Sequence, residues 1–368
     1  FIATHVEGAE HVQPDIEACT PEWAEAQTGV PAADSRHAAR LYAAGPALLW
    51  CGQGLQRQPT GGNVMRAVGL LPALTGNVGK QGSGFYYLNY TPAFAGMDLG
   101  GLAGAKLKPG SSPFGEPQTV GHMELAARLA DADEFGVFVT WNTNPVASAA
   151  DQNSLRAALT RKDLFTVAVD CFETDTVRYA DVVLPAASFL EFDDLTYSYF
   201  HLLLGVQSKV AEPQGESLPN QEIFRRLAAA MGFEEPALFE QDKPLIEQLL
   251  SDAGGRYSFE QLQALGSVYI SDEPMPLWEA LEFATPSGRI EVASLQAEAL
   301  GLPLTPAPWV DAPTGDGRLR LLTPASNWRL NDSYGNDPHL QAQAGPATVT
   351  LHPDDAARLG VSDGDPVR

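Results

Sequence analysis

WCGQGLQRQPTGGNVMRAVGLLPALTGNVGKQGSGF, residues 50 to 85, is the stretch of sequence that decides the fold. It continues a short apolar run, residues 47–51, which has the length and composition of a buried strand. Gly52, Gln53 and Gly54 then form a polar loop with accessible backbone amides, and a largely apolar helix follows. A strand that leads through a glycine loop into a helix is the place where α/β proteins bind cofactors.

Three further apolar runs repeat this design, at residues 135–141, 164–169 and 181–184. Each has strand length and ends in polar or rigid residues. The sequence therefore predicts an α/β fold with a parallel sheet and flanking helices, and all four strand exits on the carboxyl edge where ligands bind. The exits carry amide, carboxylate and hydroxyl groups that can hold a large polar heterocycle, a ribose or a phosphate. The exit residues of interest are Asn142, Asn144, Pro145, Asp170 and Thr174.

A nicotinamide-binding dehydrogenase is not supported by this loop. The GQG at 52–54 lacks the full GxGxxG spacing that a dinucleotide fingerprint requires. Tight binding of NADH would be needed to restore that alternative.

Five blocks of sequence, in this order, resemble the molybdopterin guanine dinucleotide oxidoreductases, the family of dimethyl sulfoxide reductase and formate dehydrogenases. The patterns LTGNxGKxGxG and DxFxTDTxxxADVVLP are specific as a pair, and the resemblance covers nearly the whole chain. The blocks are GQGLQRQPTGGNVMRAVGLLPALTGNVGKQGSG (52–84), NTNPVASAAD (142–151), DCFETDTVRYADVVLPAASFLE (170–191), FATPSGRIEV (283–292), and LRLLTPASNWRLNDSYGNDP (319–338) with VTLHPDDAARLGVSDGDPV (349–367).

The resemblance implies that this chain binds molybdopterin guanine dinucleotide carrying molybdenum or tungsten. Position by position, it implies cofactor contacts from the strand exits and from the last segment of the chain. These residues are Gly52, Gln53, Gly54, Asn142, Asn144, Pro145, Asp170, Thr174, Thr323, Ser326 and Asn336.

The metal ligand and the 4Fe-4S cluster of the family are expected upstream of these blocks, so we expect no protein–metal bond from this chain. Its three cysteines, Cys19, Cys51 and Cys171, are scattered singly, whereas a cluster needs several thiolates at close spacing. The seven histidines show no HExxH or paired spacing.

The C-terminal part is expected to be the start of a small β-barrel domain, with strands at 347–351 and 366–368 around a helix at 353–359. We therefore expect a fragment of a longer protein. The expected organisation is a helical segment (1–45), an α/β cofactor-binding domain (46–190), a mixed α+β connecting region (191–300), a linker (301–315) and the truncated dinucleotide-binding barrel (316–368).

One segment departs from the family pattern. At 191–207 the sequence EFDDLTYSYFHLLLGVQ lacks the Gly-Thr that the family often has there. Tyr197, Tyr199 and His201 alternate with strand spacing and would share one face, so His201 is the single, weak candidate for a catalytic residue. A long loop is expected at 85–118, with aromatic side chains that pack on the body or line a substrate funnel.

Composition limits the partners. A net charge of −23 argues against nucleic-acid binding, which needs a basic face, and no apolar run reaches membrane-spanning length. The expected partners are a small-molecule substrate and an electron-transfer protein, and the expected location is cytoplasmic. The expected function is two-electron oxygen-atom transfer or dehydrogenation by the full-length enzyme. The alternative is a non-catalytic structural homologue, such as the large iron–sulfur subunit of respiratory complex I.

Overall fold

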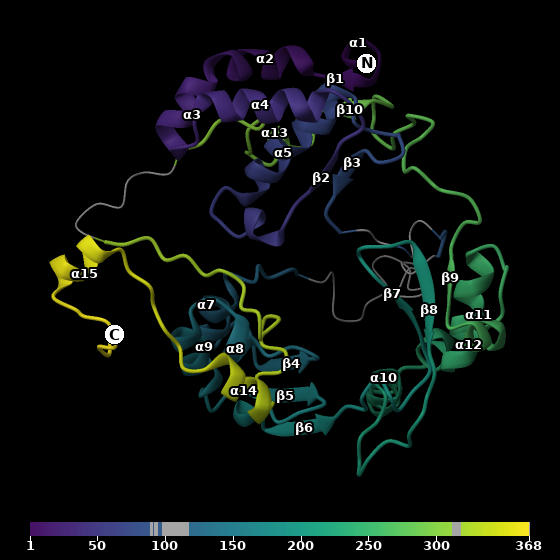
Figure 1. Ribbon diagram of the computed structural model, residues 1–368. Helices are drawn as coiled ribbons and strands as arrows, with labels where there is room; N and C mark the ends of the chain where they lie inside the picture. Colours follow the sequence, from purple (N-terminus) through teal and green to yellow (C-terminus); the bar gives the residue numbers. More distant parts are fainter. Residues whose placement is uncertain (89–90, 92–94, 98–117, 311–317, 368) are drawn as a thin grey trace. The chain divides into compact units, whose positions relative to one another are not determined.

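The computed structural model describes residues 1–88, 91, 95–97, 118–310 and 318–367. The chain divides into two compact units by its internal contacts (Figure 1). The first boundary between the units falls between Lys108 and Pro109, which lies inside the α/β domain expected at 46–190. The domain boundaries expected from the sequence stay a prediction. The first unit contains Phe1–Lys108, Asp193–Ser208 and Glu240–Leu319, and the second contains Pro109–Phe192, Lys209–Phe239 and Arg320–Arg368.

A parallel three-stranded sheet forms the centre of the second unit. Its register places Val139 opposite Val167 and Val169 opposite Leu184. Parallel neighbours cannot be joined by a hairpin, so helical crossovers connect them. The α/β fold class and three of the predicted strands are confirmed. The strands, in sheet order, are β4 (Val137–Trp141), β5 (Phe165–Asp170) and β6 (Val182–Pro185).

Helices cover one side of this sheet (Figure 1), and their apolar residues form its main core. Leu155 and Val146 are almost completely buried there, together with Leu129 and Leu164. The Asp151 side chain accepts a hydrogen bond from the Ser154 amide and caps the helix that follows it. The helices are α7 (Leu125–Ala130), α8 (Pro145–Ser148) and α9 (Gln152–Leu159).

Helix α10 (Asn220–Ala230) packs on the sheet through Ile223 and Leu227, which contact the cluster around Val169. The amphipathic pattern of this helix predicts that Arg225 and Arg226 are solvated. This is wrong for Arg225, whose side chain is only 12% exposed, and correct for Arg226, whose side chain is 65% exposed. Two 3₁₀ helices and two late helices complete the second unit. These are Val177–Tyr179, Pro236–Leu238, α14 (Pro338–Ala344) and α15 (Pro353–Leu359).

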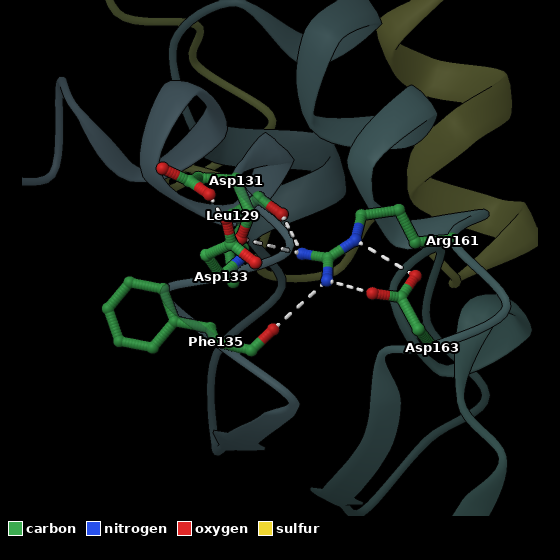
Figure 2. A network of polar contacts seen from close by, with 6 residues as sticks. All are labelled: Leu129, Asp131, Asp133, Phe135, Arg161 and Asp163. Carbon is green, nitrogen blue, oxygen red and sulfur yellow. Dashed lines mark hydrogen bonds and ion pairs between the residues drawn. The ribbon is translucent and has the colours of Figure 1, made fainter.

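Arg161 ties the loops at the amino-terminal side of the sheet together (Figure 2). Its guanidinium donates to the carbonyl oxygens of Leu129 (2.6 Å), Asp131 (3.1 Å) and Phe135 (3.2 Å). It also pairs with the Asp163 carboxylate at 2.5 Å. One planar group thus donates hydrogen bonds to acceptors at the end of α7, at the entry to β4 and in the turn before β5.

We expect Arg161→Lys to lower the melting temperature by several degrees. An ammonium is a point charge that cannot reach acceptors on all these segments at once, so backbone carbonyls lose their partner. Differential scanning calorimetry measures the change. Arg156→Lys, on the exposed face of α9, is the matched control, and equal melting temperatures for the two variants would contradict the role given to Arg161.

The first unit combines helices with three small sheets. In the N-terminal part, Thr20 Oγ1 accepts from the Trp23 amide and Pro21 begins the helix, a position that proline favours. The helices are α1 (Ile2–His5), α2 (Ala9–Ala18), α3 (Pro21–Thr28), α4 (Ala32–Ala43), α5 (Gly61–Thr75), α11 (Asp242–Asp252), α12 (Phe259–Leu265) and α13 (Leu295–Ala299), with a 3₁₀ helix at Gln53–Gln56.

The sheets of the first unit are two parallel pairs and one antiparallel triplet. The expectation that all four strand exits share one edge is wrong for the strand before Gly52. That strand, β2 (Leu48–Trp50), pairs with β3 (Gly84–Tyr86) in a separate sheet of the first unit and takes no part in the sheet of the second unit. The pairs are β1 (Val6–Glu7) with β10 (Ile290–Glu291), β2 (Leu48–Trp50) with β3 (Gly84–Tyr86), and β7 (Asp194–Tyr197), β8 (Leu203–Gln207) and β9 (Ser267–Tyr269).

Asn77 joins three elements of the first unit and is only 3% exposed. Its Oδ1 accepts from the Ala47 amide at 3.1 Å, and its Nδ2 donates to the Tyr42 carbonyl and to Thr75 Oγ1, each at 3.0 Å. The end of α4, the end of α5 and the start of β2 therefore meet at one side chain.

Two expected strands near the end of the chain are not formed in the described residues. Residues 347–351 and 366–367 have no strand pairing, although the helix between them is present and ends at Gly360. A strand needs a partner for its backbone groups, and no strand of the described residues pairs with these two segments. The carbonyls of residues 303 and 304, in the expected linker, accept hydrogen bonds from the Arg66 guanidinium. Residues 311–315 of the linker lie outside the described part of the chain, and so do most residues of the loop expected at 85–118.

Candidate functional site

The loops that leave β4 and β5 are joined by a buried hydrogen-bond clasp. Asn144 Oδ1 accepts from the Thr176 amide at 3.1 Å and from Thr176 Oγ1 at 2.7 Å. Thr176 Oγ1 in turn accepts from the Val146 amide at 3.0 Å. Thr176 is fully buried and Asn144 is 8% exposed. The two loops are thereby fixed against each other at the carboxyl edge of the sheet.

Thr176 was not among the residues predicted from the sequence. The TDT at 174–176 carried no signal that distinguishes the two threonines, because residues two apart in an extended segment lie on the same side. Thr174 is the partly exposed member, and its Oγ1 accepts weakly from the Val177 amide at 3.4 Å. Thr176 is the inward member that makes the clasp.

Asn142 and Pro145 shape the exit of β4. Asn142 has φ 49°, a left-handed conformation that asparagine tolerates, and its amide donates to the Val169 carbonyl at 3.0 Å. Pro145 begins α8 and is buried. Asn142 is exposed at the sheet edge, where its side-chain amide can contact a ligand.

Asp170 is the last residue of β5 and therefore lies at the same edge. Its Oδ1 accepts from the Cys171 amide at 2.7 Å. Burial raises the pKa of the Asp170 carboxyl, hydrogen bonds from the amides of Cys171 and Phe172 oppose the rise, and the negative charge of Asp332 adds to it. The carboxylate is thus held in an environment that disfavours its charge until a donor ligand binds.

The last segment reaches this site through Asn336, whose Nδ2 donates to the Glu173 carbonyl at 3.2 Å. Asp332 lies near enough to act on Asp170. Ser326 is exposed and its Oγ accepts from the Trp328 amide at 3.1 Å, while Thr323 is exposed. Asn336 therefore lies at the exit of β5, whereas the Ser326 hydroxyl stabilises the turn in which it lies. Asp332 is a neighbour of the site that the sequence did not indicate.

The glycine loop lies in the first unit, directly after β2. Gly52 and Gly54 face open space, since a methyl group added to either would meet no atom within 4 Å. Gln53 is exposed between them. The amides of this loop are therefore accessible to a ligand. By contrast, a methyl group on Gly61, at the start of α5, would lie 2.0 Å from the Gln56 carbonyl oxygen, so that glycine serves close packing.

An aromatic cluster borders the glycine loop. The Trp50 ring lies 5.8 Å from the Tyr86 ring and 5.7 Å from the Phe200 ring, and Tyr86 and Phe200 are 6.0 Å apart. Trp50 is 68% exposed. The rings hold the end of β2 against the turn between β7 and β8.

His201 lies in that turn and not on a strand. Strand β7 ends at Tyr197, so the expectation that Tyr197, Tyr199 and His201 share one strand face is wrong. His201 Nδ1 accepts from the Leu203 amide at 3.2 Å, and its carbonyl accepts from Thr91 Oγ1 at 3.0 Å. The turn geometry thus already occupies one ring nitrogen, and a catalytic role for His201 stays a prediction.

No group of three or more His, Cys, Asp or Glu side chains in the described part of the chain is arranged to hold a metal ion. Likewise, no described helix is both long enough and apolar enough to cross a membrane.

Comparison with known proteins defines the family. Residues 26–230 match the molybdopterin oxidoreductase family, and residues 319–368 match the molybdopterin dinucleotide binding domain. The first match covers more than half of the chain. This chain belongs to the molybdopterin oxidoreductase family, which confirms the resemblance found in the sequence.

Individual relatives agree with this assignment. The chain is 31% identical over 376 residues to the probable oxidoreductase YoaE of Bacillus subtilis, covering 100% of this chain and 54% of the relative. It is 27% identical over 430 residues to the dimethyl sulfoxide/trimethylamine N-oxide reductase of Rhodobacter capsulatus, covering 100% and 52%. Acetylene hydratase from Pelobacter acetylenicus has the same fold, with a TM-score of 0.75 at 20% identity over 99% of this chain and 56% of that structure. The chain spans about half the length of these relatives.

Taken unit by unit, the polar groups at the strand exits fit parts of a pterin dinucleotide. The net charge of −23 repels phosphates, so neutral amides such as those of Gly52 and Gly54 are the suitable donors for a pyrophosphate. Asp170 offers acceptors for the N–H groups of a guanine base. Contacts from the eleven predicted cofactor-binding residues stay predictions, and for Asn144 the structure shows its side-chain oxygen already holding Thr176.

Proposed function

We propose that this chain is the cofactor-binding part of a molybdenum or tungsten oxidoreductase that uses two molybdopterin guanine dinucleotides. The observation that supports it best is the paired exit of β4 and β5, where a clasped loop pair presents Asp170 and Thr174 beside Asn336. The full-length enzyme would transfer an oxygen atom or dehydrogenate a small-molecule substrate. Residues 1–368 would then be part of a longer polypeptide.

Each set of residues has a stated task in this proposal. Asp170 accepts from the guanine base, and Asn142 and Thr174 hydrogen-bond the polar edge of the nucleotide. Gly52 and Gly54 bind phosphate through their amides, with Gln53 as a side-chain donor. Thr323, Ser326 and Asn336 add polar groups from the last segment. When bound, the cofactor supplies a metal centre that cycles by two electrons, and the protein holds and orients it.

The remaining parts of the enzyme are proposed outside this chain. A 4Fe-4S cluster and the residue that ligates the metal would lie in an upstream region of the polypeptide. An electron-transfer protein would exchange electrons with the cluster, and the enzyme would be cytoplasmic. The acidic surface gives no support to a nucleic-acid partner.

Cofactor content tests the proposal directly. The full reading frame would be expressed anaerobically, and bound molybdenum, tungsten, iron and acid-released guanine nucleotide would be measured per chain. We expect roughly two guanine nucleotides per metal ion, as a bis-pterin cofactor requires. A folded protein without guanine nucleotide or metal would instead favour the non-catalytic structural homologue.

A further inference from the structure

The Asn144 side-chain oxygen has no capacity left for a ligand. A carbonyl oxygen has two lone pairs, and both face Thr176, one its amide and the other its hydroxyl. The Thr176 hydroxyl is likewise used as a donor to Asn144 and as an acceptor from Val146. These groups are buried, so they bond each other and not a molecule at the sheet edge.

The clasp connects the segments that carry the proposed ligand contacts. Asn144 is the capping position of α8, and its carbonyl accepts from the amides of Ala147 and Ser148, each at 3.1 Å. Thr176 begins the turn that continues to Tyr179, whose amide donates to the Thr176 carbonyl at 3.0 Å. Asn142 lies two residues before one partner and Thr174 two residues before the other. A shift of either loop would therefore move a residue proposed to contact the nucleotide.

We propose that Thr176 is a positioning residue for the guanine dinucleotide, acting through Asn144 to hold the exits of β4 and β5 in one arrangement. Asn144 then acts through its side-chain oxygen as the partner of Thr176, and not as a contact to the cofactor through that atom. This inference rests on the proposed function. It adds a distinction between the residues that touch the nucleotide and the residues that hold those residues in place. Preorganisation of this kind lowers the ordering cost of binding.

Thr176→Val tests the clasp, because valine keeps the volume of threonine and removes its hydroxyl. We expect the full reading frame carrying this change to retain about a tenth of the wild-type guanine nucleotide per chain after anaerobic purification, a loss that corresponds to ~1.4 kcal/mol. Hydrogen exchange at the Val146 amide should accelerate about tenfold, since its acceptor is gone. Thr176→Ser keeps the hydroxyl and should restore both values.

Two control variants separate positioning from other causes. Leu159→Ala, in the core at the far end of α9, should lower the melting temperature and leave the nucleotide content unchanged. Thr174→Val should reduce the nucleotide content without faster exchange at Val146. If both residues only stabilised the fold, Leu159→Ala and Thr176→Val would lose nucleotide in proportion to their lost stability.

Asn144→Ala removes the other partner of the clasp and provides a test even if Thr176→Val does not fold. The Thr176 amide and hydroxyl lose their acceptor, so we expect lost nucleotide together with faster exchange at the Thr176 amide. Faster exchange at the Thr176 amide with wild-type nucleotide content would overturn the inference. If the wild-type protein contains no guanine nucleotide, both the proposed function and this inference are overturned. If the wild-type protein contains guanine nucleotide and the Thr176→Val variant retains it, only this inference is overturned.

Discussion

Replacing Asn77 with alanine is expected to lower the free energy of unfolding of the first unit by about 3 kcal/mol. The change leaves the Ala47 amide, the Tyr42 carbonyl and the Thr75 hydroxyl without the partner that Asn77 provides. Each group is partly buried, so water replaces the lost bonds only in part. The end of α4, the end of α5 and the start of β2 would separate, and the glycine loop that follows β2 would lose its fixed position.

Hydrogen exchange at the Ala47 amide measures this effect locally, within the first unit. Asn77→Asp should cost a similar amount, because it keeps the acceptor for Ala47 but turns a negative charge toward the Tyr42 carbonyl. Gln27→Ala, an exposed amide on α3, is the control and should change nothing. Wild-type exchange at Ala47 in the Asn77→Ala variant would show that the three bonds do not hold the unit together.

Each motif contains both polar residues that bond protein groups and polar residues that are open to a ligand, and the sequence did not distinguish the two kinds. Asn77, in LTGNxGKxGxG, and Thr176, in DxFxTDT, are buried and bond protein groups, whereas Gln53 is exposed in the first unit and Asp170 is partly exposed in the second. Spacing identifies a motif without showing which of its polar residues point inward. Burial decides that, and burial depends on segments far away in the chain.

Local signals predicted local structure well. The apolar runs at 135–141, 164–169 and 181–184 formed strands, Thr20 and Asp151 cap the starts of two helices, and Gly360 ends a third. The pairing of β2 was not predictable in this way, because its partner is the three-residue strand Gly84–Tyr86, which no pattern marked as a strand. Strand pairing depends on the partner and not on the strand alone. The strand expected at 347–351 failed for the same reason.

Asp170→Asn is expected to weaken guanine nucleotide binding about thirtyfold, ~2 kcal/mol, the value of a hydrogen bond to a charged acceptor. The same change should raise the melting temperature. Burial and the charge of Asp332 raise the pKa of the carboxyl, so the folded protein disfavours the charged form. Its stability falls as pH rises through the raised pKa, and asparagine removes that dependence while its oxygen still accepts from the Cys171 amide.

Nucleotide binding has the opposite pH dependence, because the guanine donors need the ionised carboxylate. We therefore expect bound nucleotide to be lost on acidification at a higher pH than an ordinary aspartate would set. Calorimetry on the wild type and Asp170→Asn gives the stability, and acid-released guanine per chain gives the binding. Asp175→Asn, exposed in the same loop, is the matched control and should alter neither. If Asp170→Asn lost both stability and nucleotide, Asp170 would be a structural residue. A gain in stability with a loss of nucleotide is expected of a carboxylate that binds the ligand and lowers the stability of the fold.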